Sequence, residues 1–513
     1  MEHQNDGRIP GGPTTQREFE ERKSHVSELV FTGKLYDYPL DARLREHGQW
    51  RHVKNDVEGR KWELISEQKD LVESFGFNYV DQIEFMQHDR DLLFSLAERW
   101  WPQRNTFQLP LGEMTVTLWD VANILGLPIT GHPIYFTDRS DPNVLIRRYL
   151  GVSGPTGPGQ KGRSDVSVSW LRSNFMFLDR TSDAPVVVDE NRIVCCTRAY
   201  LLALCGSVLF PNGTGCKVSV RLLPFFENLK QKTPHAWGAA VLSFLYTCLT
   251  EFVKTTSNTC NTNLTGCMLL LQVWSYEHFA IGRPVTHISR ETGIFPVAKR
   301  WTVDEVDQAH CRTQVAPIYR SQFDSVEHTE VTWMPYIIRL DAPDMQRTSY
   351  SYSMHRYYII YDYRTMYHPA DRVLRQFGMV QIIPNDPLPS SYAVAQAHAR
   401  VNSLLPGWES RLEYYSVGNL SRQVQTPNDW LGDFAYISWW GAPRVCNRDY
   451  RFEEPRFTNR AIDDTSMHII INRLTDFVRF TLSIVNCNIL LNLIYLIKYI
   501  LQTYSISGMF LVF

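Results

Sequence analysis

Apolar residues recur at helical spacing in several parts of the chain, and the first such part follows residue 61. Within residues 81–101, Leu92, Leu96 and Trp100 fall at positions i, i+4 and i+8. Leu93 and Ala97 lie beside them on the same face, so the periodicity predicts an amphipathic helix that packs against a core.

The next predicted helix has clear start and stop signals. Thr117 is a suitable N-cap, and Asp120, three residues later, completes a pattern like a capping box near the positive end of the helix dipole. Gly126 and Pro128 are expected to end the helix. Its register produces one apolar stripe, formed by Leu118, Val121, Ala122 and Leu125.

Three longer apolar stretches predict further core helices. The first is 197–211, and the second begins with Thr233 as the cap and Pro234 at the first helical position. Trp237 in the second and Trp274 in the third lie on apolar faces, so we expect both to anchor the core. The stripe of the second stretch consists of Trp237, Val241, Phe244, Leu245, Cys248 and Phe252. The third stretch begins at Gly266, and its stripe consists of Cys267, Leu270, Leu271, Trp274 and His278.

Residues 348–367 depart from the helical pattern. Tyr350, Tyr352 and Met354 alternate with other residues, and Tyr357–Tyr361 favours extended structure, so one or two short strands are expected here. The chain is therefore predicted to be mainly α, with a few short β-strands. One more helix is predicted further on, opened by Thr426, Pro427, Asn428 and Asp429 and carrying Trp430, Phe434 and Ile437.

The two ends of the chain differ in composition from the middle. Residues 1–60 are polar and mixed in charge, which predicts a flexible leader without a signal peptide. Residues 480–500 are nearly uncharged and long enough to cross a bilayer. Three side chains within them are unfavourable in lipid, namely Asn486, Asn488 and Asn492. The hydrophobic tail 480–513 is therefore interpreted either as a membrane anchor or as an appended segment.

Composition narrows the class of protein without naming an activity. Of the 513 residues, 44% are hydrophobic, 21% charged and 13% aromatic, which excludes a fibrous or disordered chain. The 52 Lys and Arg residues against 54 Asp and Glu residues give a formal charge of −2. Because no overall positive field exists, any DNA contact has to come from a local patch.

The ten cysteines have no spacing typical of a zinc site, since no CxxC pair occurs. Several of them, such as Cys205 and Cys248, lie in apolar runs. Free cysteine behaves as a small hydrophobic residue, so we expect buried, reduced thiols and an intracellular, reducing compartment.

Motifs for catalysis are missing from the sequence. The Gly-rich loop 151–165 differs from a phosphate-binding loop, because Gln160 separates Gly159 from Lys161 and no Ser or Thr follows. Neither the HExxH motif of zinc proteases nor the GxSxG motif of hydrolases occurs. We therefore expect no catalytic residue, no metal site and no cofactor, and a protein that is not an enzyme.

Arg372, Arg375 and Gln376 are the most interesting polar positions. They lie on a predicted short amphipathic helix, 371–378, whose inward face consists of Val373, Leu374 and Phe377. Two alternatives remain open for the arginines: they pair with buried carboxylates, or they contact a phosphate group or a protein partner. The structural alternative is favoured, because Arg most often serves within a fold.

Four blocks along the middle of the chain are distinctive as an ordered set. They are ERWWPQRNTFQLPLGEMTVTLWDVANILGLPITGHPI (98–134), TRAYLLALCGSVLFP (197–211), AWGAAVLSFLYTCL with GCMLLLQVWSYEH (236–249 and 266–278), and HPADRVLRQFGMVQIIP (368–384). Trp333-Met334-Pro335-Tyr336 and the stretch 429–444 also match in place. Together they resemble the plant mobile domain, also called the aminotransferase-like plant mobile domain. The resemblance covers about 61–445 and leaves 446–479 as a linker before the tail.

The resemblance implies a large, mainly helical domain that is found in plant transposable elements and in domesticated host genes. Host members of the maintenance-of-meristems group are nuclear and act in transposon silencing, genome stability and meristem maintenance. A non-catalytic nuclear interaction protein is therefore expected, although no basic import cluster supports the nuclear location. The alternatives are a transposon-encoded protein that assists mobility, with DNA binding, and a membrane protein anchored by its tail.

The resemblance also implies partners. Some family members carry the domain beside a serine/threonine phosphatase or act with a phosphatase of the protein phosphatase seven type. This chain lacks the phosphatase motifs GDxHG, GDxxDRG and GNHE, and no lysine lies in a recognisable pyridoxal-phosphate setting, so it resembles a stand-alone domain. We expect protein partners, such a phosphatase among them, an indirect link to DNA or chromatin, and membrane contact only through residues 480–500.

Overall fold

The computed structural model describes residues 25–26, 43–44 and 61–384, the last range with gaps at 137, 139, 156–163, 177–188, 212–216, 257–258, 261–262, 290–291, 308–313, 328–329, 337–343, 356, 363 and 382–383. The chain divides into two units, Met1–Arg451 and Phe452–Phe513, and all described residues belong to the first unit. The predicted leader, the predicted helix near Trp430 and the tail 480–513 therefore have no described structure beyond residues 25–26 and 43–44.

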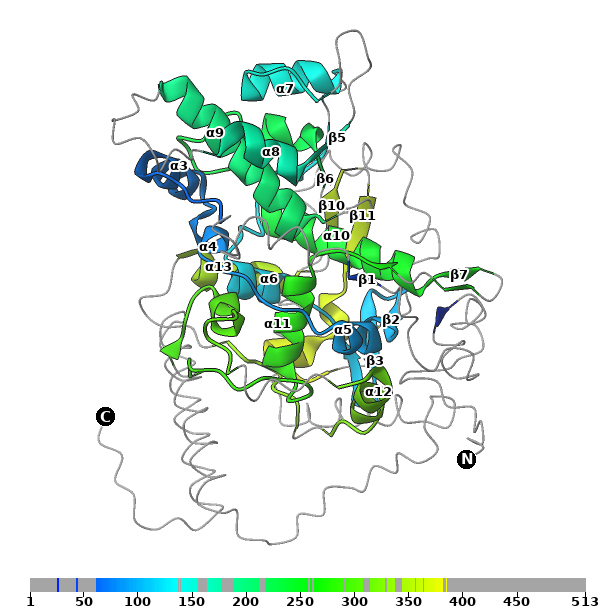
Figure 1. Ribbon diagram of the computed structural model, residues 1–513. Coiled ribbons are helices and arrows are strands. Elements are labelled where there is room, and N and C mark those ends of the chain that lie inside the picture. Colours follow the sequence, from blue (N-terminus) through cyan, green and yellow to red (C-terminus); the bar gives the residue numbers. More distant parts are fainter. Residues whose placement is uncertain are drawn as a thin grey trace, which may run out of the picture. The chain divides into compact units, whose positions relative to one another are not determined.

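Helices dominate the described part of the chain, as the periodicity predicts (Figure 1). The α-helices are α3 (Ser66–Phe75), α4 (Asn78–Asp81), α5 (Arg90–Ala97), α6 (Leu118–Leu125), α7 (Pro142–Leu150), α8 (Val168–Phe175), α9 (Glu190–Leu204), α10 (Trp237–Val253), α11 (Met268–His278), α12 (Ala316–Asp324) and α13 (Asp344–Ser353). A π-helical turn, η2 (Cys205–Leu209), continues α9. The 3₁₀ helices are η3 (Val220–Phe226), η5 (Val297–Trp301), η7 (Ala370–Arg372) and η8 (Leu374–Phe377).

The strands are short and form small separate sheets. β2 (Trp100–Trp101), β3 (Thr106–Leu109) and β4 (Gly112–Met114) form an antiparallel sheet in which Phe107 pairs with Trp100 and Met114. The predicted strand at Tyr357–Tyr361 is confirmed as β10, which pairs with β11 (Arg364–His368). The other pairs are β1 (Arg43–Leu44) with β9 (Asn263–Leu264), β5 (Asp165–Ser167) with β6 (Lys217–Ser219), and β7 (Thr255–Thr256) with β8 (Thr259–Cys260).

The predicted helix after Thr117 is confirmed as α6. The Thr117 hydroxyl accepts a hydrogen bond from the Asp120 amide at 3.2 Å, and Asp120 Oδ2 accepts one from the Thr117 amide at 2.6 Å. This reciprocal pair is a capping box. Gly126 ends the helix with a φ of +66°, and a Cβ atom there would lie 2.4 Å from the Cβ of Tyr79. Both the backbone conformation and the close packing therefore require glycine.

Two predicted elements change type because tertiary contacts override the local pattern. Helix α5 is shorter than predicted, since Trp100 leaves it and pairs with Phe107 in the three-stranded sheet. Tyr350 and Tyr352 lie in helix α13 and not in a strand. There the Tyr350 ring packs edge-on against Trp119 with the centroids 5.3 Å apart, which fixes it on a second core cluster.

Helix α10 begins later than predicted, at Trp237. The preceding segment is extended, because residues 132 and 235 form an isolated parallel β-bridge. Thr233 is therefore not the cap of this helix. Its hydroxyl accepts hydrogen bonds from the Trp237 Nε1–H at 3.0 Å and from the His235 amide at 3.3 Å.

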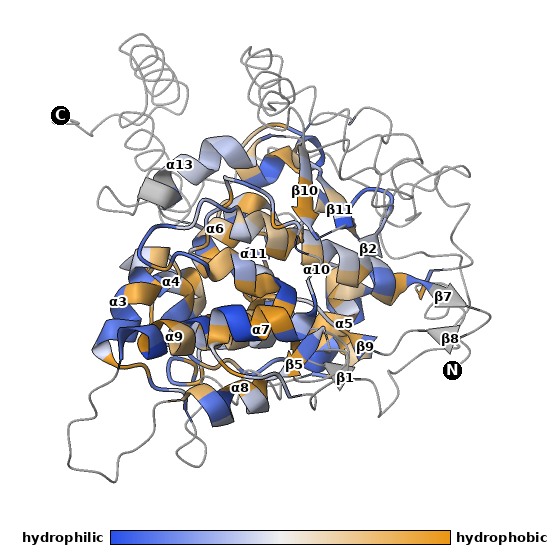
Figure 2. Cartoon of the chain, turned by 90° about the horizontal axis from the view of Figure 1, so that it is seen from above, coloured by the Kyte–Doolittle hydropathy of each residue, from blue (hydrophilic) through white to orange (hydrophobic). Residues whose placement is uncertain are grey.

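The main core is built around α10 and α11. Helix α10 contacts α5, α6, β2, β9, β10 and β11, and hydrophobic residues run along α10 and α11 in Figure 2. Trp237 and Trp274 are fully buried at 0% exposure, so both are confirmed as core anchors. A smaller second core cluster contains Trp119, Ala370, Val373, Leu374 and Phe377.

The five cysteines whose side chains the structure describes are free thiols, and four of them are buried, as predicted. Cys196, Cys205, Cys248 and Cys267 are buried, and Cys195 is partly exposed. Burial raises the pKa of the Cys205 thiol well above its usual range, so it is an inert packing residue. The segment Glu190–Leu209 is long and apolar enough to cross a membrane, but most of it is buried inside the protein, which is typical of a core helix.

Candidate functional site: a buried polar cluster at the start of helix α6

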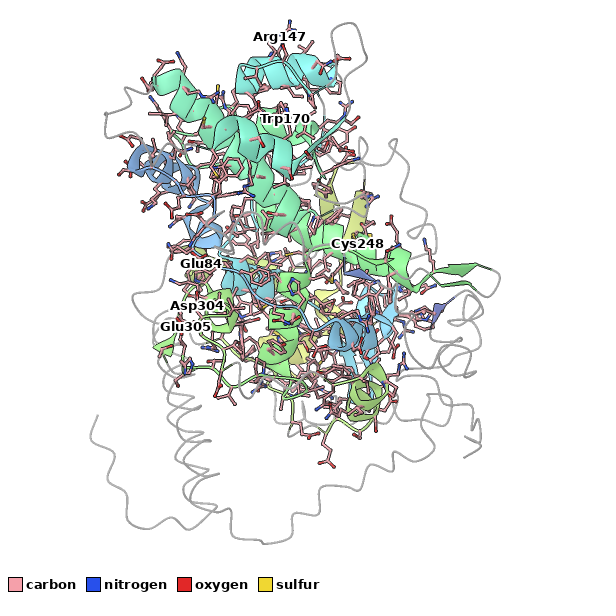
Figure 3. All side chains as sticks on the ribbon, in the orientation of Figure 1. Glu84, Arg147, Trp170, Cys248, Asp304 and Glu305 are labelled. Atoms are coloured by element: carbon pink, nitrogen blue, oxygen red, sulfur yellow. The ribbon has the colours of Figure 1, made fainter. Side chains whose placement is uncertain are left out.

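Polar side chains from distant parts of the sequence meet around the connection between β4 and α6. Strands β3 and β4 contribute from one side, the end of α11 from another, and residues 368–376 from a third. Figure 3 shows side chains filling the space between α6 and α11. All three candidate residues of the sequence analysis belong to this cluster.

Arg372 forms a buried ion pair with Glu113 on β4. Its Nη1 donates to Glu113 Oε2 at 2.9 Å and to Oε1 at 3.2 Å, and the two side chains are 7% and 0% exposed. The Thr106 hydroxyl donates to Glu113 Oε1 at 3.0 Å, and Arg104 Nη1 lies 3.5 Å from the same oxygen. The carboxylate is thus surrounded by donors, as a buried charge requires.

The charges around Glu113 keep it ionised in the protein interior. Burial on its own would raise the pKa of this carboxyl, but the charges of Arg372 and Arg104 outweigh burial, and the pKa is lowered. The ion pair therefore connects the segment around Arg372 to the β3–β4 hairpin, and because both side chains are buried, water and salt screen it only weakly.

Gln376 and Arg375 bind the backbone of the same hairpin and its exit. The Gln376 side chain accepts from the Thr115 amide at 2.9 Å and donates to the Thr115 carbonyl at 2.8 Å, so it pairs with the backbone as a neighbouring strand would. Arg375 Nη1 donates to the Leu111 carbonyl at 2.9 Å, and its guanidinium lies 5.4 Å from the Trp333 ring centroid.

The Arg372–Glu113 pair corresponds to the structural alternative, in which an arginine pairs with a buried carboxylate. The bonds of Arg375 and Gln376 described above are made to backbone groups instead. The predicted helix around them is instead a pair of 3₁₀ turns, η7 and η8, although Val373 and Phe377 point inward as expected. The bonds described above are all made within the chain, and contact of these residues with a phosphate group or a partner stays a prediction.

Asp120 is the second buried carboxylate of the cluster. Its Oδ1 lies 3.0 Å from His278 Nε2 and accepts a hydrogen bond from the Tyr336 hydroxyl at 2.7 Å. Its Oδ2 accepts from the Thr117 amide and hydroxyl, both at 2.6 Å. Asp120 therefore caps α6 and at the same time joins this helix to α11 and to residue 336.

His368 is the member of the cluster that binds the first turn of α6. Its Nε2 accepts a hydrogen bond from the Leu118 amide at 3.2 Å, and its Nδ1 lies 3.0 Å from the His355 carbonyl. The proton of the neutral ring is thus on Nδ1, where a carbonyl accepts it. Burial lowers the pKa of His368 to about 4, so the ring is uncharged at neutral pH.

The buried His368 links the stability of the protein to pH. Since its pKa drops from the usual 6.5 to about 4 on folding, the unfolded chain binds a proton between these values that the folded chain excludes. The free energy of unfolding therefore falls as the pH falls through this window. We expect a loss of about 3 kcal/mol from this group, measured by urea unfolding at a series of pH values.

A pair of variants isolates this contribution. His368→Gln has no group that titrates in the window, so its stability should depend less steeply on pH. His287→Gln changes an exposed histidine and should keep the slope of the unchanged protein. Equal slopes for all three proteins would contradict the assignment of the pH dependence to His368.

Comparison of the sequence with models of known protein families identifies the family of this chain. The model of the family described as "Plant mobile domain" matches residues 76–441. The chain belongs to the plant mobile domain family. The matched range includes every residue of the buried polar cluster.

Three relatives of this plant mobile domain protein come from Arabidopsis thaliana. Protein MAIN-LIKE 1 is 35% identical over 73% of this chain and 69% of its own length. Protein MAINTENANCE OF MERISTEMS is 31% identical over 71% of each chain. A serine/threonine-protein phosphatase 7 long form homolog is 32% identical over 73% of this chain, but over only 27% of its own length. No solved structure matches the chain significantly.

The pairings of this plant mobile domain could not be read from the sequence. Asp120 and His278 are 158 residues apart, and Glu113 and Arg372 are 259 residues apart. From the sequence pattern, Asp120 is predicted only as a capping residue, and His278 is predicted to lie on an apolar helix face. A polar residue on an otherwise apolar stripe, as at His278, is the one signal that points to a buried partner.

The bonds of the cluster join segments that are distant in the sequence. Within the described ranges, no group of three or more His, Cys, Asp or Glu side chains could hold a metal ion. Two further buried ion pairs follow the same design, Glu277 with Arg300 at 2.9 Å and Glu98 with Arg320 at 2.9 Å. Such pairs stabilise one arrangement of the chain, because removing either partner leaves a buried charge.

Proposed function

We propose that this chain is a non-catalytic nuclear interaction protein that takes part in transposon silencing, genome stability and meristem maintenance. The observation that carries the proposal is its similarity to MAIN-LIKE 1 and to MAINTENANCE OF MERISTEMS over more than two thirds of each chain. The name of the second protein refers to meristems. The family model of the plant mobile domain matches residues 76–441 of this chain.

The structure supports an interaction role through the use of its polar groups. The polar groups of Glu113, Asp120 and His368 are buried and bond within the fold, where they join segments distant in the sequence. The similarity to the phosphatase homolog covers about a quarter of that protein, and this chain lacks the phosphatase motifs. We therefore assign phosphatase activity, where it is needed, to a partner and not to this chain.

The proposed partners are other proteins. A phosphatase of the protein phosphatase seven type is the first candidate, because part of a serine/threonine-protein phosphatase 7 long form homolog is similar to this chain. DNA or chromatin would be reached through such partners, since the formal charge of −2 provides no general attraction to phosphates.

Replacement of a relative in the plant tests this function. We expect the full chain, tagged at its N-terminus, to enter nuclei and to lower transposon transcripts in Arabidopsis thaliana that lacks MAIN-LIKE 1. A second version that ends at residue 475 should behave in the same way if the tail is an appended segment. Transcript levels and the location of the tag are measured in the same plants.

Two outcomes would contradict the proposal. A nuclear, correctly expressed chain that leaves transposon transcripts unchanged would exclude a silencing role. A full chain on membranes beside a nuclear truncated chain would show that the tail is an anchor, and silencing would not be the function of the full-length form.

A further inference from the structure

Helix α12 carries aliphatic side chains on the face that points away from the core. The helix packs against α5 (Figure 1), and its inner residues Ala316, Tyr319 and Phe323 are buried. Val315, the N-cap, and Ile318, one turn later, are 54% and 48% exposed. A surface helix normally presents polar side chains on this face. The two residues therefore form an uncovered apolar stripe.

A pocket lies beside this stripe, between α12 and the loop that follows α11. It has a volume of about 220 Å³ and is lined by residues 280–284, Gln314 and Gln322. Sites for small molecules and cofactors start at about 300 Å³, so the pocket suits a single side chain of a partner. Val285, next to the wall, is 58% exposed. Of the six exposed large hydrophobic residues in the described part of the chain, three thus border this one place, and such clustering is typical of an interaction site.

The walls of the pocket are held by contacts within the chain. Gly282 has a φ of +62°, and a Cβ atom there would lie 3.0 Å from Tyr319 Cε1, so the loop packs closely on α12. The Arg283 Nε–H donates to the Phe279 carbonyl at 2.8 Å, and the Gln314 amide donates to the Tyr319 hydroxyl at 3.0 Å. The pocket therefore exists before a partner binds, which lowers the entropy cost of binding.

The segment that borders the pocket is negatively charged. Residues 303–330 contain six Asp or Glu residues and two Arg residues, a formal charge of −4, whereas the whole chain has −2. One of the two, Arg320, pairs with a buried glutamate at 2.9 Å. The Asp307 amide donates to the Val285 carbonyl at 2.9 Å, and Glu327 is exposed just after the end of α12. This excess of negative charge favours a basic partner and disfavours nucleic acid.

We propose that the pocket together with Val285, Val315 and Ile318, the α12 surface, binds a segment of a partner protein in which aliphatic residues alternate with Lys or Arg. The carbon stem of a lysine or arginine packs on the exposed aliphatic side chains, while its charged end reaches the polar groups of the pocket and the acidic segment. This inference rests on the proposed role as an interaction protein, and it assigns one class of partner to one surface.

Fluorescence anisotropy with a labelled peptide of alternating leucine and lysine residues tests the α12 surface on the purified full chain. We expect saturable binding that weakens at high salt, and no binding of the same peptide with glutamate in place of lysine. Ile318→Asn should weaken binding about tenfold, because an aliphatic contact at the centre of the surface is lost. The matched control is Val144→Asn on α7, where Val144 is 47% exposed; it should bind as the unchanged protein does.

A second pair of variants tests the charge of the surface. Glu327→Lys places a like charge beside the basic peptide and should weaken binding. Glu67→Lys makes the same change at an exposed position on α3 and should leave binding unchanged. All four variants change exposed side chains, and circular dichroism checks that each is folded.

Three results would overturn the proposal. They are no binding of the lysine peptide to the unchanged protein, equal binding by Ile318→Asn and Val144→Asn, and self-association of the chain that Ile318→Asn abolishes, which would make a second copy the occupant. Peptide binding is measured on the purified chain, so its failure leaves the transcript result in the plant standing. Peptide binding without any change of transposon transcripts would contradict the proposed function but not the α12 surface.

Discussion

Replacing Trp237 by alanine is expected to lower the free energy of unfolding by about 3–5 kcal/mol. The indole is fully buried and packs flat against Phe226, with the centroids 5.4 Å apart, and edge-on against Phe77 at 5.0 Å and Phe75 at 6.3 Å. Its Nε1–H also donates to the Thr233 hydroxyl. The change leaves a cavity lined by aromatic rings, which the surrounding helices fill only in part.

Denaturant unfolding of the variant measures this effect against a matched aromatic residue. Tyr352 is 43% exposed, so Tyr352→Ala should change the free energy of unfolding by no more than about 0.5 kcal/mol. A near-neutral Trp237→Ala would contradict the role of the indole as a core anchor.

Replacing Arg372 by methionine should also cost about 3–5 kcal/mol of unfolding free energy, for an electrostatic reason. The variant has an unbranched side chain without a charge, so the fully buried Glu113 loses its ion pair with Arg372 and keeps Arg104, whose Nη1 lies 3.5 Å from Oε1. Burial then raises the pKa of Glu113 with less opposition. The loss of stability should therefore be smaller at acidic pH, where the carboxyl is protonated.

Two further variants separate charge from packing. Adding Glu113→Gln to Arg372→Met removes the buried charge, and the double variant should be more stable than Arg372→Met alone. Arg148→Met is the control, because its side chain is 57% exposed and its ion pair with Asp138 at 3.7 Å is screened by water. A double variant that is as unstable as the sum of the two single changes would contradict a direct coupling.

Signals confined to a few neighbouring residues predicted structure well. The capping box at Thr117, the stop at Gly126 and the apolar faces of Trp237 and Trp274 are all observed. Each depends on propensity and spacing within one or two helical turns, and these are visible in the sequence.

Features set by distant contacts could not be predicted. Trp100 fits a helix by its spacing, but the strand partner Phe107 decides its structure. Thr233 resembles a cap, but pairing with the segment at His132 keeps it extended. For the site, the sequence offered two alternatives for Arg372, and only the position of Glu113 in space shows its partner.

The separation between Glu113 and Arg372 has a consequence for how the protein is made. A ribosome adds residues in order, so the β3–β4 hairpin emerges 259 residues before its cation. Until then Glu113 has to stay in water, and the hairpin cannot pack into a finished core. Folding of this domain is therefore completed late in synthesis, and nascent chains that end before residue 372 should remain open to chaperones and proteases.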